Sequence, residues 1–119
     1  MLIFGHSLIK MQKFVKLKDD FDKTSVNCFD YNEKEIAKAK KLQIDFAVFA
    51  KNENEIILSN ALSAKYILID NEQLAIIASK LAEFYLFDTK ILLLVDDLEN
   101  LIHAYKLKVD GVCLKSYIR

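Results

Sequence analysis

Four short apolar runs of this chain each stop close to an Asp or Asn, and beside each run an Asx-x-x-Glu/Gln tetrad opens a helical pattern. The runs are Val26–Phe29, Phe46–Ala50, Tyr66–Ile69 and Ile91–Val95, and a fifth, Val109–Leu114, ends in Lys115. An Asx residue followed three positions later by Glu or Gln is a signature of a helix N-terminus. The pattern therefore predicts strands and helices in alternation, which restricts the chain to the α/β class.

The tetrads predict where the helices begin. They are Asn32–Glu35, Asn52–Glu55, Asp70–Gln73 and Asp96–Glu99. The helices expected from them span Asn32–Gln43, Asn52–Ala64, Asn71–Leu86 and Asp97–Leu107. The third has the most regular apolar spacing, at i, i+3, i+4 and i+7, which is typical of a helix with one buried face.

The strands are apolar throughout instead of alternating with polar residues, which is typical of parallel sheets buried on both faces. We expect a single α/β domain over residues 1–119, with a parallel sheet of about five strands and helices on both faces, in a flavodoxin-like arrangement. Residues 1–25 are less regular, with short strands expected near Leu2–Phe4 and Lys13–Leu17. This N-terminal segment is expected to pack on the sheet. The side chains expected to cover it are Leu8, Ile9, Phe14, Val15, Leu17 and Phe21.

Composition excludes several classes of function. The chain has 17 basic and 17 acidic residues, and this balance argues against a nucleic-acid partner, which requires a concentrated basic patch. No apolar window approaches the roughly 20 residues of a membrane span, and the run Met1–Phe4 is too short for a signal-peptide core. Cys28 and Cys113 lie in expected buried strands without metal-ligand spacing. We therefore expect a cytoplasmic protein that binds neither a membrane nor a nucleic acid.

Ligands of open α/β sheets bind at the carboxyl ends of the strands. The chain places Asp30, Asp70, Asp96 and Lys115 at that edge, and His6 follows the first short strand. These four charged residues form the candidate site, of an acidic or phosphate-binding type. A structural explanation competes with it, because Asp70 and Asp96 each stand where an N-cap would stabilise a helix by about 1 kcal/mol. Two of the four tetrads use Asn instead of Asp, which favours capping.

The stretch from Lys65 to Ile118 resembles the later half of a response-regulator receiver domain. "KYILID" is similar to the strand that ends in the phosphorylated aspartate, and "GVCLK" to the last strand with its lysine. The resemblance implies Asp70 as phosphoacceptor, Lys115 as its cationic partner, and Mg²⁺ held by Asp30 and Asp70. The chain departs from the family at Asp96, where receivers carry Ser or Thr, and lacks the paired acids after the first strand. A degenerate, non-phosphorylated relative fits these departures better than a working receiver.

A second resemblance is to phosphate-binding (β/α)₈ barrels, carried by "NALSAKYILID" and "AYKLKVDGVCLK". A complete barrel needs at least about 200 residues, so this resemblance implies a half-barrel that pairs with a second copy. The chain has no GxGxxG or Walker-type phosphate loop.

The residues available for nucleophilic catalysis are few. His6 and His103 are the only histidines, and neighbouring residues such as His6 and Ser7 point to opposite sides of an extended segment. The leading hypothesis is a non-catalytic, receiver-like regulatory or protein-binding module without a cofactor, with a protein partner or a second copy as its ligand. The alternative is a small-molecule or phosphate-binding protein or enzyme that uses the acidic edge.

Overall fold

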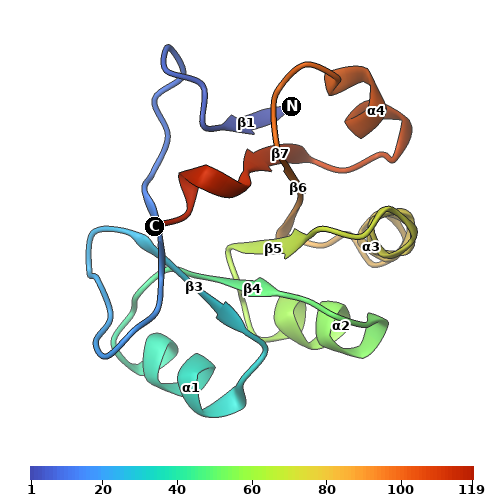
Figure 1. Ribbon diagram of the computed structural model, residues 1–119. Coiled ribbons are helices and arrows are strands. Elements are labelled where there is room, and N and C mark those ends of the chain that lie inside the picture. The colour runs from blue at the N-terminus through green and yellow to red at the C-terminus, as the bar shows by residue number, and fades with distance from the viewer.

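The computed structural model describes residues 1–119 as a seven-stranded sheet with four α-helices (Figure 1). The strands are β1 (Leu2–Phe4), β2 (Phe14–Lys16), β3 (Val26–Asp30), β4 (Phe46–Phe49), β5 (Tyr66–Ile69), β6 (Lys90–Val95) and β7 (Gly111–Leu114). The helices are α1 (Glu33–Lys41), α2 (Glu53–Ala61), α3 (Glu72–Tyr85) and α4 (Leu101–Lys106), and a 3₁₀ turn, η1, covers Lys115–Tyr117. None of the helices combines the length and the apolar character that crossing a membrane requires.

All strand pairs are parallel, and the strand order is β1-β7-β6-β5-β4-β3-β2. From β2 to β7 each strand therefore lies beside its neighbour in sequence, and β1 joins beyond β7. A flavodoxin-like sheet instead reverses its order at a switch point. In this sheet the chain winds in one direction only. Because all strands are parallel, their carboxyl ends lie at the same side of the sheet.

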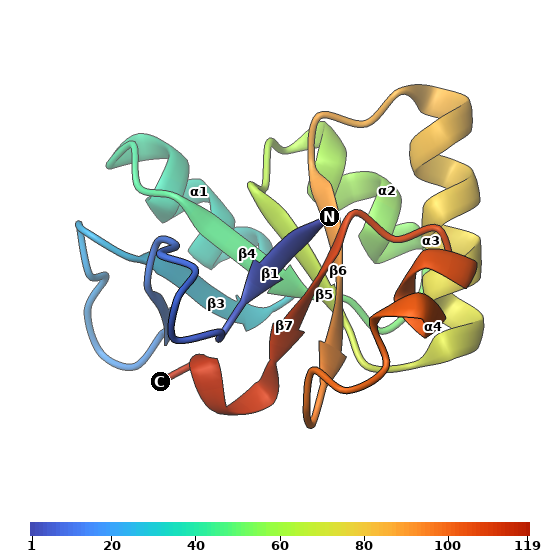
Figure 2. The ribbon, with the colours of Figure 1, turned by 90° about the horizontal axis from the view of Figure 1, so that it is seen from above.

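All four α-helices pack on one face of the sheet. The paired residues Phe29, Val48 and Ile67 in β3, β4 and β5 share this face because they are in register. Phe29 and Val48 pack with Ile36 of α1, and Ile67 packs with α2, α3 and α4. Figures 1 and 2 show the helices arranged around the outside of the sheet. Helices on both faces were expected; strands that are apolar on both sides indicate burial of both faces but not what buries them.

The other face curls inward and is filled by the chain's own side chains. This inner cluster consists of Phe4, Phe14, Val26, Cys28, Ala47, Tyr66, Leu68, Leu92 and Cys113. Phe4 and Phe14 belong to the two edge strands, yet their ring centroids are 4.7 Å apart. Beyond β7, Ile118 forms an isolated parallel bridge with Phe14. The sheet is therefore a partly closed barrel with a seam between β1 and β2, and its inner face offers no open surface for pairing two half-barrels.

The α/β class with a parallel sheet and flanking helices is confirmed, with seven strands instead of about five. The two additional strands, β1 and β2, are the short strands expected near Leu2–Phe4 and Lys13–Leu17, and they form the two edges of the sheet. Of the covering residues expected in the N-terminal segment, Phe14 is buried in the inner cluster, whereas Leu8 is 88% exposed.

Candidate functional site

The carboxyl ends of the strands form one side of the molecule, which faces the viewer in Figure 1 and points downward in Figure 2. We name this side the carboxyl rim. Parallel strands alternating with outer helices bring their connecting loops together at such a rim, where the active sites of (β/α)₈ barrels are found. Asp30 ends β3, Asp70 and Asp96 follow β5 and β6, and Lys115 follows β7, as predicted.

Three of the four predicted residues line one hollow of about 290 Å³, named here the rim pocket. Asp70, Asp96 and Lys115 surround it together with Asp97 and with His103 of α4. Leu93, Val95 and Val112 contribute to its apolar lining. The strand ends thus place carboxylates and a lysine around a space on the scale of a small organic molecule.

Capping does not account for Asp70 or Asp96. The N-cap of α3 is Asn71, whose side-chain oxygen accepts a hydrogen bond from the Leu74 N–H at 2.9 Å. The expected helix at Asp97 begins only at Leu101, and its N-cap, Asn100, forms no capping hydrogen bond. The prediction that Asp70 and Asp96 are N-caps is therefore wrong, whereas Asn32 and Asn52 do cap α1 and α2 as predicted.

The charges of the rim pocket are only partly compensated. Lys115 Nζ lies 3.3 Å from a carboxylate oxygen of Asp96, so the lysine pairs with Asp96 and not with Asp70, which was its expected partner. His103 contacts Glu72 through its Nε2. Asp97 only accepts a hydrogen bond from the Glu99 N–H. Asp70 forms no side-chain hydrogen bond or ion pair, so Asp70 and Asp97 leave the pocket with unpaired negative charge.

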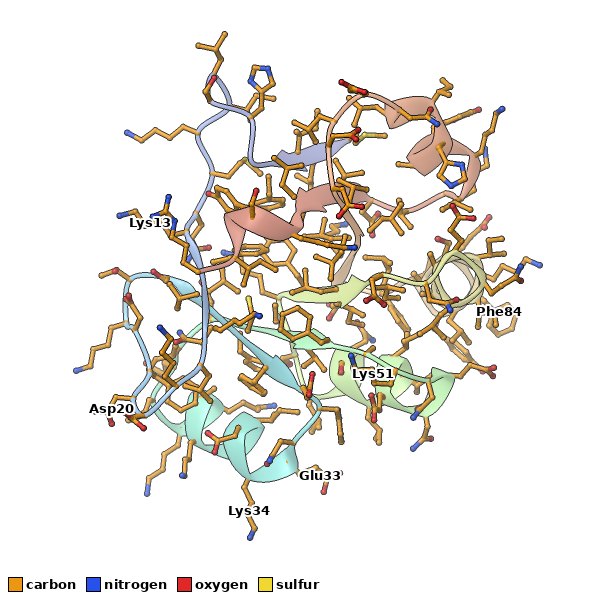
Figure 3. All side chains as sticks on the ribbon, in the orientation of Figure 1. Lys13, Asp20, Glu33, Lys34, Lys51 and Phe84 are labelled. Atoms are coloured by element: carbon orange, nitrogen blue, oxygen red, sulfur yellow. The ribbon has the colours of Figure 1, made fainter.

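Asp30 lies outside the rim pocket. It borders a separate hollow of about 400 Å³ at the ends of β2, β3 and β4, together with Lys16 and Lys51. Lys51 Nζ lies 4.0 Å from a carboxylate oxygen of Asp30, and Lys51 also lines a third hollow that contains Asp70. Figure 3 shows Lys51 near α2, below the middle of the rim face. Of the four predicted site residues, Asp70, Asp96 and Lys115 therefore line one pocket, and Asp30 lines a different hollow.

The side chains that could act as nucleophiles are poorly placed for this role. Burial raises the pKa of the Cys28 thiol to about 12, and the neighbouring Cys113 adds to the shift. Burial likewise raises the pKa of Cys113 to about 12, so both thiols stay protonated at neutral pH. His6 is exposed, and its Nδ1 accepts a hydrogen bond from the Leu8 N–H at 3.1 Å instead of joining the rim pocket.

Sequence reasoning missed His103 and Lys51 as residues of the rim. His103 falls within the expected helix Asp97–Leu107. Because α4 starts four residues later than expected, His103 lies in its first turn, beside the pocket. Lys51 follows β4 at a position comparable to that of Asp70 after β5, so its place at a strand end was a usable signal.

No group of three or more His, Cys, Asp or Glu side chains is arranged to hold a metal ion. The Mg²⁺ ligand set implied by the receiver resemblance is not assembled, because Asp30 and Asp70 line different hollows. In comparisons with known proteins, no family model matches the chain and no curated protein matches it.

Proposed function

We propose that this protein binds a small molecule with a cationic group in the rim pocket, as a binding protein without chemistry of its own. The observation that carries the proposal is the free carboxylate of Asp70, which caps no helix and pairs with no cation although it borders a hollow at the carboxyl rim. We further propose a cytoplasmic location, in keeping with the two unpaired thiols of Cys28 and Cys113.

A cationic group fits this pocket better than an anion. An anion would face two carboxylates without ion-pair partners, Asp70 and Asp97, while Lys115 is already paired with Asp96. An ammonium or guanidinium group could donate hydrogen bonds to both carboxylates, and such charge-assisted bonds are the stronger kind. The apolar lining at Leu93 and Val112 would hold an attached hydrocarbon portion.

The test is a calorimetric titration of the purified chain with small amines, from methylammonium to putrescine, alongside the matching carboxylates and phosphates. We expect saturable binding of an amine, weakened about fivefold in Asp70→Asn, since a partly exposed ion pair contributes up to about 1 kcal/mol. Asp88→Asn is the matched control, because Asp88 is an exposed aspartate that precedes β6, at the opposite end of the strands. Selective binding of the anions, or equal loss in both variants, would refute the proposal.

A second candidate is self-association, since a homodimer is one of the two kinds of partner expected from the sequence. The observation that favours it is a run of three exposed apolar residues at the end of α3: Phe84 is 78% exposed and Leu86 is 84% exposed, with Tyr85 between them. Figure 3 shows Phe84 projecting from the outer side of α3. Sedimentation velocity tests it: a dimer that dissociates in Phe84→Ser supports self-association through this surface, and a wild-type monomer at high concentration excludes it.

A further inference from the structure

Another hollow, of about 630 Å³, lies at the seam where β1 and β2 do not join. Its walls are the connection between these two strands and the segment that follows β7. We name it the seam pocket and define it by Lys10, Met11, Lys13, Leu114, Tyr117 and Arg119. Its size falls within the range of small-molecule sites, and it shares no lining residue with the rim pocket.

The charged side chains that line the seam pocket are all basic. Lys10, Lys13 and Arg119 line it, no acidic side chain does, and none of the three takes part in an ion pair. Lys13 forms no ion pair with Asp22. Hydrogen bonds from Thr24 lower the pKa of Asp22 most, and the positive charge of Lys13 contributes least. In a chain with equal numbers of basic and acidic residues, three unpaired cations around one hollow favour an anionic ligand.

The walls of the pocket are fixed by hydrogen bonds that join distant parts of the chain. The Tyr117 hydroxyl lies 3.1 Å from the Met11 carbonyl oxygen and 3.0 Å from that of Gln12, and donates to this pair. The Arg119 N–H donates to the Phe14 carbonyl at 3.1 Å. These bonds hold the segment after β7 against the start of β2, so the basic side chains project from an ordered backbone.

Gly5 allows the connection after β1 to approach the side chain of Leu114 closely. It has a φ of +124°, and a Cβ at this position would lie 2.7 Å from the Leu114 side chain. Any other residue would push the connection after β1 away from Leu114. The chain therefore has a glycine where the two walls of the pocket meet.

We propose that the seam pocket binds a small molecule that carries a phosphate group. The phosphate lies among Lys10, Lys13 and Arg119, and the organic portion packs on Met11, Leu114 and the ring of Tyr117. Arg and Lys donate charge-assisted hydrogen bonds to phosphate oxygens, and the apolar floor retains ligands that a bare cationic surface would not. This binding site is independent of the one proposed at the rim.

The test is an NMR titration of the full chain with pyrophosphate, compared with sodium chloride at the same ionic strength. We expect saturable shifts of the amide signals of Lys13, Ser116 and Tyr117 with pyrophosphate only. Lys13→Gln should weaken the binding about fivefold, which is the effect of one charge-assisted contact. Lys34→Gln should leave it unchanged, because Lys34 is an exposed lysine of α1 that lies at the bottom of Figure 3, away from Lys13.

Shifts that do not saturate, that chloride reproduces, or that Lys13→Gln leaves unchanged would overturn the proposal. Asp70→Asn separates the two sites. It should bind pyrophosphate like the wild type even if the rim pocket binds no amine, and a loss of pyrophosphate binding in this variant would place the anion at the rim instead of the seam.

Discussion

At the scale of single residues, the choice of capping residue decides how the acidic side chains are interpreted. Asp70 and Asn71 are adjacent and both are good N-caps, so the sequence alone could not distinguish them. The helix starts at Glu72, which leaves Asn71 in the capping position and turns Asp70 toward the rim pocket. The candidate residues could thus be found from their positions at the ends of strands. The role of Asp70, by contrast, depends on whether the helix starts one residue earlier or later, which the sequence does not reveal.

Replacing the two neighbours separately tests this assignment. Asn71→Ala should lower the free energy of unfolding by about 1 kcal/mol, because it removes the acceptor for the Leu74 N–H. Asp70→Ala should change it by less than about 0.5 kcal/mol, because this carboxylate makes no structural contact. Urea unfolding followed by circular dichroism measures both. A larger loss in Asp70→Ala than in Asn71→Ala would restore Asp70 as the cap and remove the main support for a rim site.

At the scale of secondary-structure elements, β3 to β7 and the four helices were predictable because each apolar run and each apolar helix face is long enough to be distinctive. The start of α4 was not, since Asp97 and Leu98 continue the expected pattern although Asp97 only forms a turn with Glu99. β1 and β2 have three residues each, and their place at opposite edges of the sheet depends on contacts with distant strands.

The attachment of β1 to β7 depends on Gly111. A Cβ at Gly111 would lie 2.2 Å from the carbonyl oxygen of Leu2, a backbone atom that cannot move without moving the strand. Gly111→Ala should therefore destabilise the protein by about 2 kcal/mol or more and release β1 from the sheet. Hydrogen exchange should show the largest loss of protection in β1 and in the strand end at Leu114. Unchanged exchange there would mean that β1 tolerates the displacement.

At the scale of the whole molecule, the sequence predicted a buried parallel sheet but not its curvature. Strands that are apolar on both faces are compatible with helices on either side, so the single layer of helices and the self-filled inner face could not be deduced. In a flat sheet of seven strands the two edges would stand about 29 Å apart, at about 4.8 Å per strand. Curling brings Phe4 and Phe14 into contact and creates both the common rim and the seam.

A double-mutant cycle tests the curvature. Phe4→Leu and Phe14→Leu should each destabilise the protein, and the double variant should differ from the sum by about 1 kcal/mol, because the two rings pack against each other. Phe29→Leu provides the control: Phe29 lies on the outer face, so its effect should add to that of Phe4→Leu within about 0.5 kcal/mol. If the losses of unfolding free energy in Phe4→Leu and Phe14→Leu simply add, the two rings, and with them the two edges of the sheet, are not in contact.

The free carboxylate of Asp70 carries the proposal of a ligand site at the carboxyl rim. Carbon-detected NMR of the aspartate carboxyl groups during a putrescine titration tests it most directly. We predict that the Asp70 and Asp97 carboxyl signals shift together along one saturable curve while the Asp88 signal stays in place. Equal, non-saturating shifts of all exposed aspartates, or no shift of Asp70, would contradict a ligand site at Asp70.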